Sequence, residues 1–441
     1  MPTENAPMSM YRTKEGMGLW EHQGKVVAVG IGVSPTARRW DGTPETSVGG
    51  WSILALRKAM EDAGVKPEEV DGLVMTPDTS TGSPWPSGRP VPEDFLKMYK
   101  STDNPVDGIA RLSSDWILKN MPELNNIKFT MYGPGCMSNS LVVAAQAVGE
   151  GLTDVCLVLR GWHNFEGRYY VGQGATAGKT ISGNGKWTTL WGTVACYNSA
   201  MIFNAYCHKY GKNHDMMAQF VVNSKRNGLL FPEGFFYQHR PERLTAEDYL
   251  ASRWIAKPAN LYDNDMPICV SAAFLLTTAE RAKDMKQKPV YILNHTRTMP
   301  ASRGLLPTLE EWQDAADSTG RKLYEGAGIG PSDLSFENMY DGFTLFHQFH
   351  LEGLRFAGVQ RGEALDFYQT DISIEGPNPV SPSGGNTGNG RTRFWLYIDS
   401  IQQLQGRAGD RQIRKPAEVG VSGAFFPDNN YSLVWSANPP V

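Results

Sequence analysis

The stretch Lys128 to Gly161, KFTMYGPGCMSNSLVVAAQAVGEGLTDVCLVLRG, contains the pattern that decides the fold. A β-rich run leads into a Gly-Pro-Gly-Cys turn, and an Ala- and Val-rich helix follows. Cys136 therefore stands where a strand ends and a buried helix begins. At the positive end of a helix dipole, backbone N–H groups can lower the pKa of a thiol and stabilise an oxyanion. The segment predicts either a presented nucleophile or a structural cysteine, because free cysteine also packs as a small hydrophobic residue.

The composition is typical of a globular protein with a large core. The chain has 441 residues and a formal net charge of −4. It contains no long run of basic residues that would indicate nucleic-acid binding. Its five cysteines form no CxxC pair, which argues against zinc ribbons and disulfides and favours a reducing compartment. The apolar runs are shorter than the roughly 20 residues that a membrane span needs, and the N-terminus lacks a signal-peptide core. We expect a cytoplasmic chain without a membrane span.

Strand and helix signals alternate along most of the chain. Early in the sequence they predict a strand at 26–31, a helix at 49–64, an irregular loop rich in Pro and Ser at 76–103, and a helix at 109–119. Later they predict a strand at 268–278, a helix at 393–406 and a β-hairpin at 418–436. This rhythm indicates a duplicated α/β core.

A polar, helical stretch separates the two βαβ-rich parts of the chain, and we interpret it as an insertion that caps one face of the core. The sequence therefore predicts four parts, which are an N-terminal arm at 1–25, a first half at 26–198, a helical insertion at 199–262 and a second half at 263–441.

Five segments share the order and spacing of motifs in one known family. They are the cysteine segment at 131–160, RPERLTAEDYLASRWIAKP at 240–258, the acid-, Pro-, Cys- and Ala-rich run at 263–281, ENMYDGF at 337–343, and PSGGNTGNG at 382–390 with QLQG at 403–406. Together they resemble the thiolase superfamily, specifically the sterol-carrier or lipid-transfer type of thiolase. The similarity extends from about Val26 to the C-terminus.

The resemblance implies the thiolase fold, in which two pseudo-symmetric βαβαβ halves form five layers of helix and sheet and two copies usually form a dimer. It also implies a substrate that contains CoA, with no permanently bound cofactor and no metal. Cys136 falls on the nucleophile position of the family. Proteins of this type often pair with a small OB-fold protein that carries a zinc ribbon. The Pro-rich loop and the helical insertion are our candidate docking surfaces for such a partner.

The chain departs from the family at its catalytic bases. Tyr340 stands where the HDxF motif has histidine, and Arg391 stands where the GHP motif has histidine. Ser422 aligns with the second catalytic cysteine of degradative thiolases. A thiolytic cycle needs a thiolate and two bases, and Cys136 supplies only the first of these groups.

The steroid side-chain aldolases of this superfamily carry tyrosines in both histidine slots, and Tyr340 matches the first. Retro-aldol cleavage of a β-hydroxyacyl-CoA needs no covalent intermediate, so we predict this reaction first. To act as a base, Tyr340 needs a pKa about 3 units lower, which corresponds to roughly 4 kcal/mol. The cation of Arg391 is one source of this stabilisation. Alternatively, Tyr340 acts as a neutral acid. Cys136-dependent acyl transfer is the second hypothesis, and a non-catalytic acyl-CoA scaffold is the third.

The remaining candidates lie in loops that close on the expected site. For close backbone approach to the pantetheine or the thioester oxygen we predict Gly384, Gly385, Asn386, Gly390, Ser422 and Gly423. His163 and His295 follow strand-like runs and either supply the missing base or belong to the core. His347 and His350 share a helical face, and without a third ligand nearby we expect a core or surface role.

Overall fold

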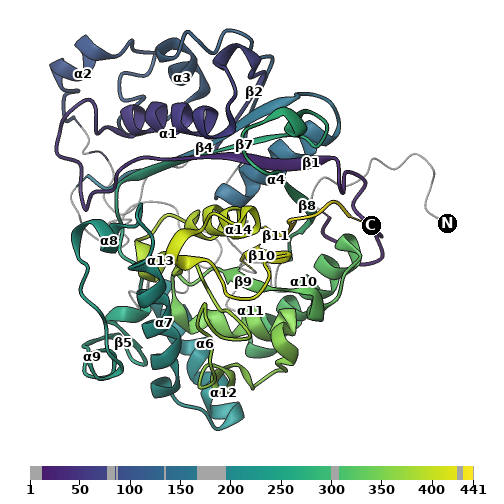
Figure 1. Cartoon of the computed structure of the whole chain (residues 1–441). Coiled ribbons are helices and arrows are strands. Elements are labelled where there is room, and N and C mark those ends of the chain that lie inside the picture. The colour runs from purple at the N-terminus through teal and green to yellow at the C-terminus, as the bar shows by residue number, and fades with distance from the viewer. Residues whose placement is uncertain are drawn as a thin grey trace.

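The computed structural model describes residues 12–76, 85, 88–133, 136–165, 195–298, 307–424 and 431–440. Two α/β halves lie on top of one another, and a group of helices lies beside the second half (Figure 1). No helix of these residues is long and apolar enough to cross a membrane. The predicted boundaries at residues 25, 198 and 262 stay predictions, but the strand at 270–278, which we counted with the second half, pairs with two strands of the first half.

Nine of the described strands form one sheet in the order β3-β2-β4-β7-β1-β8-β11-β10-β9. The strands of the first half are β1 (Val26–Val33), β2 (Gly72–Met75), β3 (Phe129–Tyr132), β4 (Val155–Trp162) and β7 (Val270–Thr278). Those of the second half are β8 (Val290–Thr296), β9 (Phe336–Met339), β10 (Val419–Gly423) and β11 (Ser432–Ser436).

The two halves repeat one pairing scheme. In the first half β1 and β4 are antiparallel to β7, and β4 is parallel to β2. In the second half β8 and β10 are antiparallel to β11, and β10 is parallel to β9. A short antiparallel contact between β1 and β8 joins the halves. The same order and direction of strands on both sides of this contact confirm the predicted duplication.

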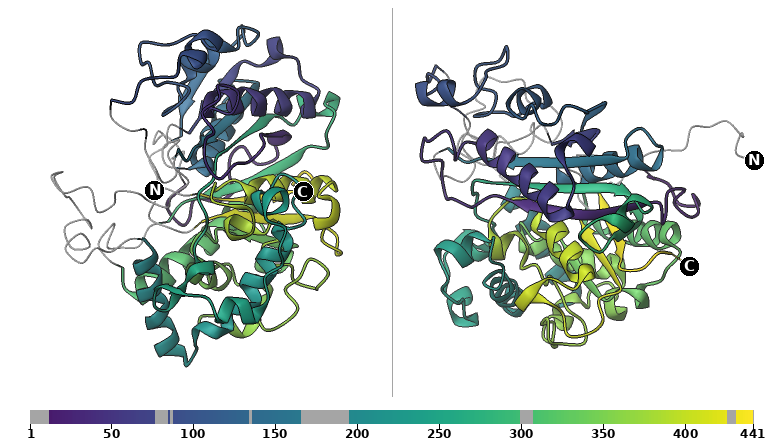
Figure 2. Two further views of the ribbon diagram at one scale, coloured as in Figure 1. Left: turned by 90° about the vertical axis from the view of Figure 1, so that its left-hand side faces the viewer. Right: turned by 45° about the horizontal axis from the view of Figure 1, so that its top comes forward.

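Five layers follow from the positions of the helices. The outer layer of the first half holds α1 (Val48–Ala63), α2 (Glu93–Met98) and α3 (Ser114–Asn120), and the middle layer holds α4 (Met137–Gly149) and α14 (Trp395–Gln405). The outer layer of the second half holds α10 (Leu309–Ala327), α11 (His347–Leu354) and α12 (Ala364–Phe367). Figure 2 shows the same order from two further directions. Three apolar cores fill the spaces between these layers.

The first helix of each half begins and ends with the same devices. The hydroxyl of Ser47 accepts a hydrogen bond from the N–H of Gly50, which caps α1, and Thr308 caps α10 in the same way. Gly64 and Gly328 end the two helices with φ of +72° and +67°, a conformation that glycine adopts without strain.

The helices beside the second half come mainly from the predicted insertion. They are α6 (Ala195–Tyr210), α7 (Ala218–Gly228), α8 (Phe235–His239) and α9 (Ala246–Leu250), with the two-stranded ribbon β5 (Trp254–Ala256) and β6 (Ala259–Asn260). α7 crosses the short helix α13 (Gly385–Asn389), and a Cβ on Gly228 would lie 2.1 Å from the carbonyl oxygen of Gly388. The insertion therefore supports the glycine-rich segment directly.

Most of the predicted elements are confirmed. The strand at 26–31 is β1, the helices at 49–64 and 393–406 are α1 and α14, and the two runs at 418–436 pair as β10 and β11. The turn of that hairpin lies outside the described residues. Two predictions were wrong: the helix expected from Ile109 begins only at Ser114, where Ser113 caps it, and the loop at 76–103 contains α2.

Candidate active site

Cys136 occupies the position that the sequence predicted, at the N-terminal cap of α4. Its backbone is extended, with φ of −143° and ψ of 174°, and the residue is buried. Its Sγ lies 2.8 Å from the hydroxyl oxygen of Ser138. That oxygen also accepts a hydrogen bond from the N–H of Tyr431 at 3.0 Å, so the hydroxyl hydrogen can point to the sulfur. The thiol is thus held between the start of a helix and a hydroxyl group.

Tyr397, on the neighbouring helix α14, shares this environment. Burial raises the pKa of its phenol well above the usual value, and the charge of Cys136 raises this pKa further. A hydrogen bond with Ser138 and the guanidinium groups of Arg160 and Arg393 lower it. The two helices of the middle layer therefore meet at a group of a thiol, a phenol and two cations.

Tyr340 lies directly after β9, in the second half. Its N–H donates to the carbonyl oxygen of Gly423 at 2.8 Å, and its ring lies 5.4 Å below the guanidinium group of Arg393. A Cβ on Gly342 would lie 2.1 Å from the hydroxyl oxygen of Tyr340 and 2.6 Å from Oδ2 of Asp265. The absence of a side chain at Gly342 therefore brings a phenol and a carboxylate together.

Asp341 and Asn386 fix the loops around Tyr340. The carboxylate of Asp341 accepts hydrogen bonds from the backbone N–H groups of Asn386 and Thr387, at 2.6 and 3.1 Å, where α13 begins. The amide of Asn386 donates to Oδ2 of Asp265 at 3.4 Å and accepts from the N–H of Arg393 at 3.0 Å. Burial raises the pKa of Asp341, although the hydrogen bonds from Thr387 and Asn386 oppose the rise. One buried network thus holds Tyr340, Asp265 and the arginine turn in register.

A cavity of about 630 Å³ opens beside this network. Asp265 and Met266 line its inner end, and Arg391 donates its N–H to the carbonyl oxygen of Met266. Five basic side chains also line the cavity: Arg38, Lys225, Arg240, Arg243 and Arg253. Burial and the cation of Arg240 lower the pKa of Lys225 to about 7, although Asp341 opposes the shift. The cavity therefore places a predominantly cationic lining and the carboxylate of Asp265 on the same space.

Comparisons with known proteins agree with this geometry. Residues 307–425 match the family described as Thiolase C-terminal domain-like. The chain is 27% identical over 417 residues to the 17-hydroxy-3-oxo-4-pregnene-20-carboxyl-CoA lyase of Mycobacterium tuberculosis, covering 91% of this chain and 94% of that protein. It is 28% identical over 378 residues to the steroid side-chain-cleaving aldolase of Thermomonospora curvata, covering 83% of this chain and 86% of that protein.

The structure matches that of an Ltp2-ChsH2(DUF35) aldolase with a TM-score of 0.74 and 22% sequence identity, over 94% of this chain and 98% of that chain. These matches show that the chain is similar to proteins of the thiolase superfamily. The predicted thiolase fold is confirmed, and so is the likeness to the steroid side-chain aldolases of the superfamily.

Arg391 lies near Trp162, and its role at the thiol or at Tyr340 stays a prediction. Its guanidinium group lies 5.8 Å from the ring centroid of Trp162, and Arg160 lies 4.1 Å from the same ring. The cations that act on the phenol next to the thiol are those of Arg160 and Arg393. The cationic residue that lies over Tyr340 is likewise Arg393, two residues after the position the superfamily motif indicated.

Backbone conformation and close contacts inside the protein explain why glycine occupies three of the predicted positions. Gly384, Gly385 and Gly390 have φ of +75°, +60° and +97°. A Cβ would lie 2.3 Å from the backbone nitrogen of Gly228 at Gly384, and 2.2 Å from Oδ2 of Asp341 at Gly385. These glycines let the α13 segment approach the insertion and the Asp341 carboxylate. Contact of the same segment with a substrate stays a prediction.

Ser422 and Gly423 lie at the end of β10, under the Tyr340 loop. The hydroxyl of Ser422 is buried and accepts a hydrogen bond from the indole N–H of Trp435 at 2.7 Å. Gly423 has φ of +144° and presents its carbonyl oxygen to the N–H of Tyr340. The core therefore holds Ser422, and Gly423 fixes the backbone of the candidate catalytic tyrosine.

The four histidines considered from the sequence belong to the core of the molecule. Burial lowers the pKa of both His163 and His295 to about 3, which makes them weak bases. Nδ1 of His347 lies 2.9 Å from the hydroxyl of Tyr368, and its Nε2 lies 3.3 Å from Glu337. Burial also lowers the pKa of His350 well below its usual value.

Sequence reasoning missed Asp265, Arg393, Arg160 and Tyr397. Asp265 belongs to a segment that the sequence linked to the superfamily, NDMPICV, but its carboxylate was not singled out. Its N–H donates to the carbonyl oxygen of Gly342 at 3.0 Å, which brings the two segments together. No sequence signal marks Tyr397, because its role depends on the approach of α14 to α4.

Proposed function

We propose that this chain cleaves the side chain of a β-hydroxyacyl-CoA thioester by a retro-aldol reaction, on a bulky, ring-bearing substrate of the steroid type. The observation that carries the proposal is the pair of Tyr340 and Asp265, two buried oxygen groups that lie 2.1 and 2.6 Å from where a Cβ of Gly342 would be. The named activities of the Mycobacterium tuberculosis and Thermomonospora curvata relatives are of the same class.

Tyr340 and Asp265 together can move the proton that this reaction releases. The phenol accepts the proton of the substrate β-hydroxyl while it passes its own proton to the carboxylate, so a free tyrosinate need not form. The Cα–Cβ bond then breaks, its electron pair moves to the thioester as an enolate, and the β-carbon leaves as a ketone or aldehyde. Proton return to Cα gives the shortened acyl-CoA and restores the pair.

The cation of Arg393 stabilises negative charge that develops on the phenol or on the enolate. Its guanidinium group lies over the ring of Tyr340 and also acts on Tyr397. A water-poor site strengthens such interactions, and Tyr340 and Asp265 are both buried. The residues therefore supply a proton acceptor, a proton donor and a cation for the enolate.

The basic side chains of the cavity are suited to the phosphates of CoA, which enters as part of the substrate and not as a resident cofactor. Arg38, Arg240 and Arg243 lie on the same cavity as Asp265. Guanidinium groups bind phosphate oxygens in pairs, which also sets the orientation of the ligand. In this arrangement the thioester extends inward from the arginines toward the tyrosine.

Cys136-dependent acyl transfer is the second candidate function. The observation that favours it is the position of the thiol at the cap of α4, with the hydroxyl of Ser138 at 2.8 Å. A thiolate there would attack the β-carbonyl of a β-ketoacyl-CoA and keep the β-acyl group as a thioester, while the Cα–Cβ bond breaks and Cα leaves as the enolate of the shorter acyl-CoA. In this scheme Tyr340 would protonate the leaving carbon.

We also propose two protein partners. The edge strand β3 has Met131 and Tyr132 at 46% and 41% exposure, and an exposed, partly apolar edge is suited to pairing with a second copy of the chain. A DUF35 protein is the second proposed partner, because the structural relative is an Ltp2-ChsH2(DUF35) aldolase. Copurification of the tagged chain with its own untagged copy and with a DUF35 protein tests both.

A comparison of substrates tests the proposed reaction. The chain, alone and with a DUF35 partner, is incubated with a β-hydroxyacyl-CoA that carries a ring system and, separately, with a β-ketoacyl-CoA plus free CoA. Liquid chromatography with mass spectrometry follows the products. Release of a ketone or aldehyde from the first substrate supports the proposal. Cleavage of only the second substrate would establish acyl transfer, and turnover of neither would leave an acyl-CoA scaffold.

A further inference from the structure

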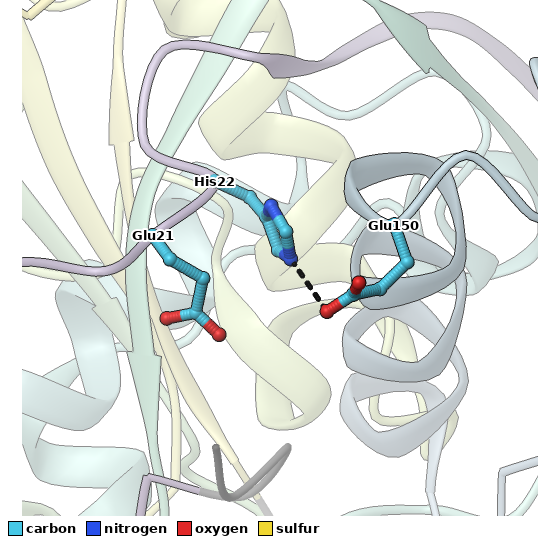
Figure 3. A group of neighbouring side chains, drawn as sticks. All are labelled: Glu21, His22 and Glu150. Atoms are coloured by element: carbon cyan, nitrogen blue, oxygen red, sulfur yellow. Dashed lines mark hydrogen bonds and ion pairs between the residues drawn. The ribbon is translucent and has the colours of Figure 1, made fainter. Parts of the chain in front are cut away.

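Three potential metal ligands meet on the side of the molecule opposite the catalytic end of α4. Glu21 and His22 come from the segment before β1, and Glu150 caps the C-terminal end of α4 (Figure 3). One ligand atom of each residue lies within 4.8 Å of the other two. Nε2 of His22 points to Oε1 of Glu150 at 3.1 Å. Neighbouring ligand atoms of a tetrahedral zinc site are about 3.3 Å apart, so the His22–Glu150 distance suits a small cation.

A buried glutamine provides a second, independent observation. The side-chain nitrogen of Gln146 lies 3.4 Å from Oε1 of Glu21, 3.2 Å from Nε2 of His22 and 3.0 Å from Oε1 of Glu150. Nε2 of His22 donates to Glu150, so the two amide hydrogens of Gln146 point to the carboxylates of Glu21 and Glu150. Gln146 is only 7% exposed, and its Oε1 has no hydrogen-bond partner in the described part of the chain.

A half-turn of the Gln146 amide gives its side-chain oxygen a partner if a cation is bound. The exchange places Oε1 among the three other ligand atoms and takes the nitrogen away from them. Four ligands would then converge, one imidazole nitrogen and three oxygens. Imidazole with carboxylate oxygens suits first-row divalent metals such as zinc, whereas magnesium and calcium prefer oxygen ligands alone.

The charges around the cluster leave room for such a cation. Arg12 engages Glu21 through the other carboxylate oxygen, Oε2, at 3.3 Å, so Oε1 stays directed to the cluster. Hydrogen bonds from His22 and Gln146 lower the pKa of Glu150, and the cation of Lys25 lowers it further. The carboxyl end of α4 carries the negative end of its dipole, which favours positive charge. Two carboxylates and a helix end thus outweigh two basic side chains.

We propose that Glu21, His22, Gln146 and Glu150 form a structural binding site for a divalent first-row cation, tested with Zn²⁺. The metal would fasten the segment before β1 to the carboxyl end of α4, the helix whose other end presents Cys136. The proposal does not depend on the reaction that the chain catalyses. It adds a site of a class that the sequence gave no reason to expect.

The test is a Zn²⁺ titration of the untagged full chain after treatment with a chelator, against a chromophoric competitor. We expect one tight site per chain and a rise in Tm on addition of Zn²⁺. Glu150→Gln removes one ligand at a half-exposed position, so the variant should fold and bind at least tenfold more weakly. Glu61→Gln, at the exposed carboxyl end of α1, is the matched control and should bind like the original chain. Below about pH 6 binding should weaken, because protonated imidazole cannot coordinate.

Co²⁺ distinguishes this site from the five cysteines of the chain. Coordination by nitrogen and oxygen gives weak visible bands, whereas coordination by thiolate adds strong absorption in the near ultraviolet. The proposal predicts the first spectrum and its loss in both Glu150→Gln and His22→Gln. Absence of tight Zn²⁺ binding, equal affinity in Glu150→Gln and Glu61→Gln, or a thiolate spectrum would each overturn it.

Discussion

The regions around Cys136 and Tyr340 occupy opposite halves of the same duplicated fold, but the two residues have different polar contacts. Cys136 is presented by the cap of α4 and has the hydroxyl of Ser138 beside its sulfur. Tyr340 is anchored to Gly423, covered by Arg393 and set against Asp265. The superfamily position for a nucleophile is kept, and the polar groups that our proposed mechanism uses surround the tyrosine. This difference is the basis of our proposal that the reaction depends on Tyr340.

Replacement of the two residues should give the largest contrast. Tyr340→Phe removes the proton-carrying oxygen but keeps the ring, and we expect kcat for ketone release to fall about 10³-fold. Cys136→Ser should stay within about threefold of the original chain. The release of carbonyl product is measured for each variant, with near-ultraviolet circular dichroism as the check of folding. The reverse order of effects would return the catalytic role to the thiol.

A methyl group at Gly342 should separate the phenol from the carboxylate. Its carbon would lie 2.1 Å from the hydroxyl of Tyr340 and 2.6 Å from Asp265, so Gly342→Ala should lower kcat at least about 100-fold. Gly330→Ala is the control, because the nearest atom to its Cβ would be Oδ2 of Asp333 at 3.9 Å. Activity of Gly342→Ala equal to that of Gly330→Ala would show that the pair does not act together.

Asp265→Asn should have a smaller effect than either of these changes. The amide keeps the size of the side chain but cannot accept a proton, so we expect kcat to fall by roughly 10- to 100-fold with little change in KM. Steady-state kinetics and Tm are measured on the same preparations. A large rise in KM with normal kcat would instead assign Asp265 to substrate binding.

The charge of Lys225 should have the smallest effect on catalysis, and it tests whether the cavity binds CoA. Its pKa of about 7 means that the ammonium is charged below pH 7 and loses its charge as the pH rises above 7. The KM for the acyl-CoA should therefore rise above pH 7, by up to about tenfold for the loss of one phosphate contact. Lys225→Gln should have the raised KM at all pH values, whereas Lys100→Gln, at an exposed position, should follow the original profile. A pH-independent KM in the original chain would contradict this role.

The sequence predicted those parts of the site that a single motif carries. Cys136 lies at a strand-to-helix junction that glycine, proline and small residues mark, and Tyr340 lies in a motif whose usual histidine is missing. The order of strands and helices was predictable for the same reason, since each element has its own hydrophobic period and caps.

The partners of these residues depend on tertiary contacts that no local pattern records. Asp265 reaches Tyr340 because its backbone pairs with Gly342, and Tyr397 reaches Cys136 because two central helices pack together. The glycines at 384 and 385 looked suited to a ligand, but they meet Gly228 and Asp341. A sequence shows which residues are able to come close, and the packing decides what they approach.

Intact-protein mass spectrometry during turnover of a β-hydroxyacyl-CoA tests the central claim most directly. The account predicts that carbonyl product and shortened acyl-CoA accumulate while the mass of the chain stays unchanged, in the original protein and in Cys136→Ser alike. An added acyl mass that forms on the original chain and is absent from Cys136→Ser would contradict it and establish covalent catalysis by the cysteine.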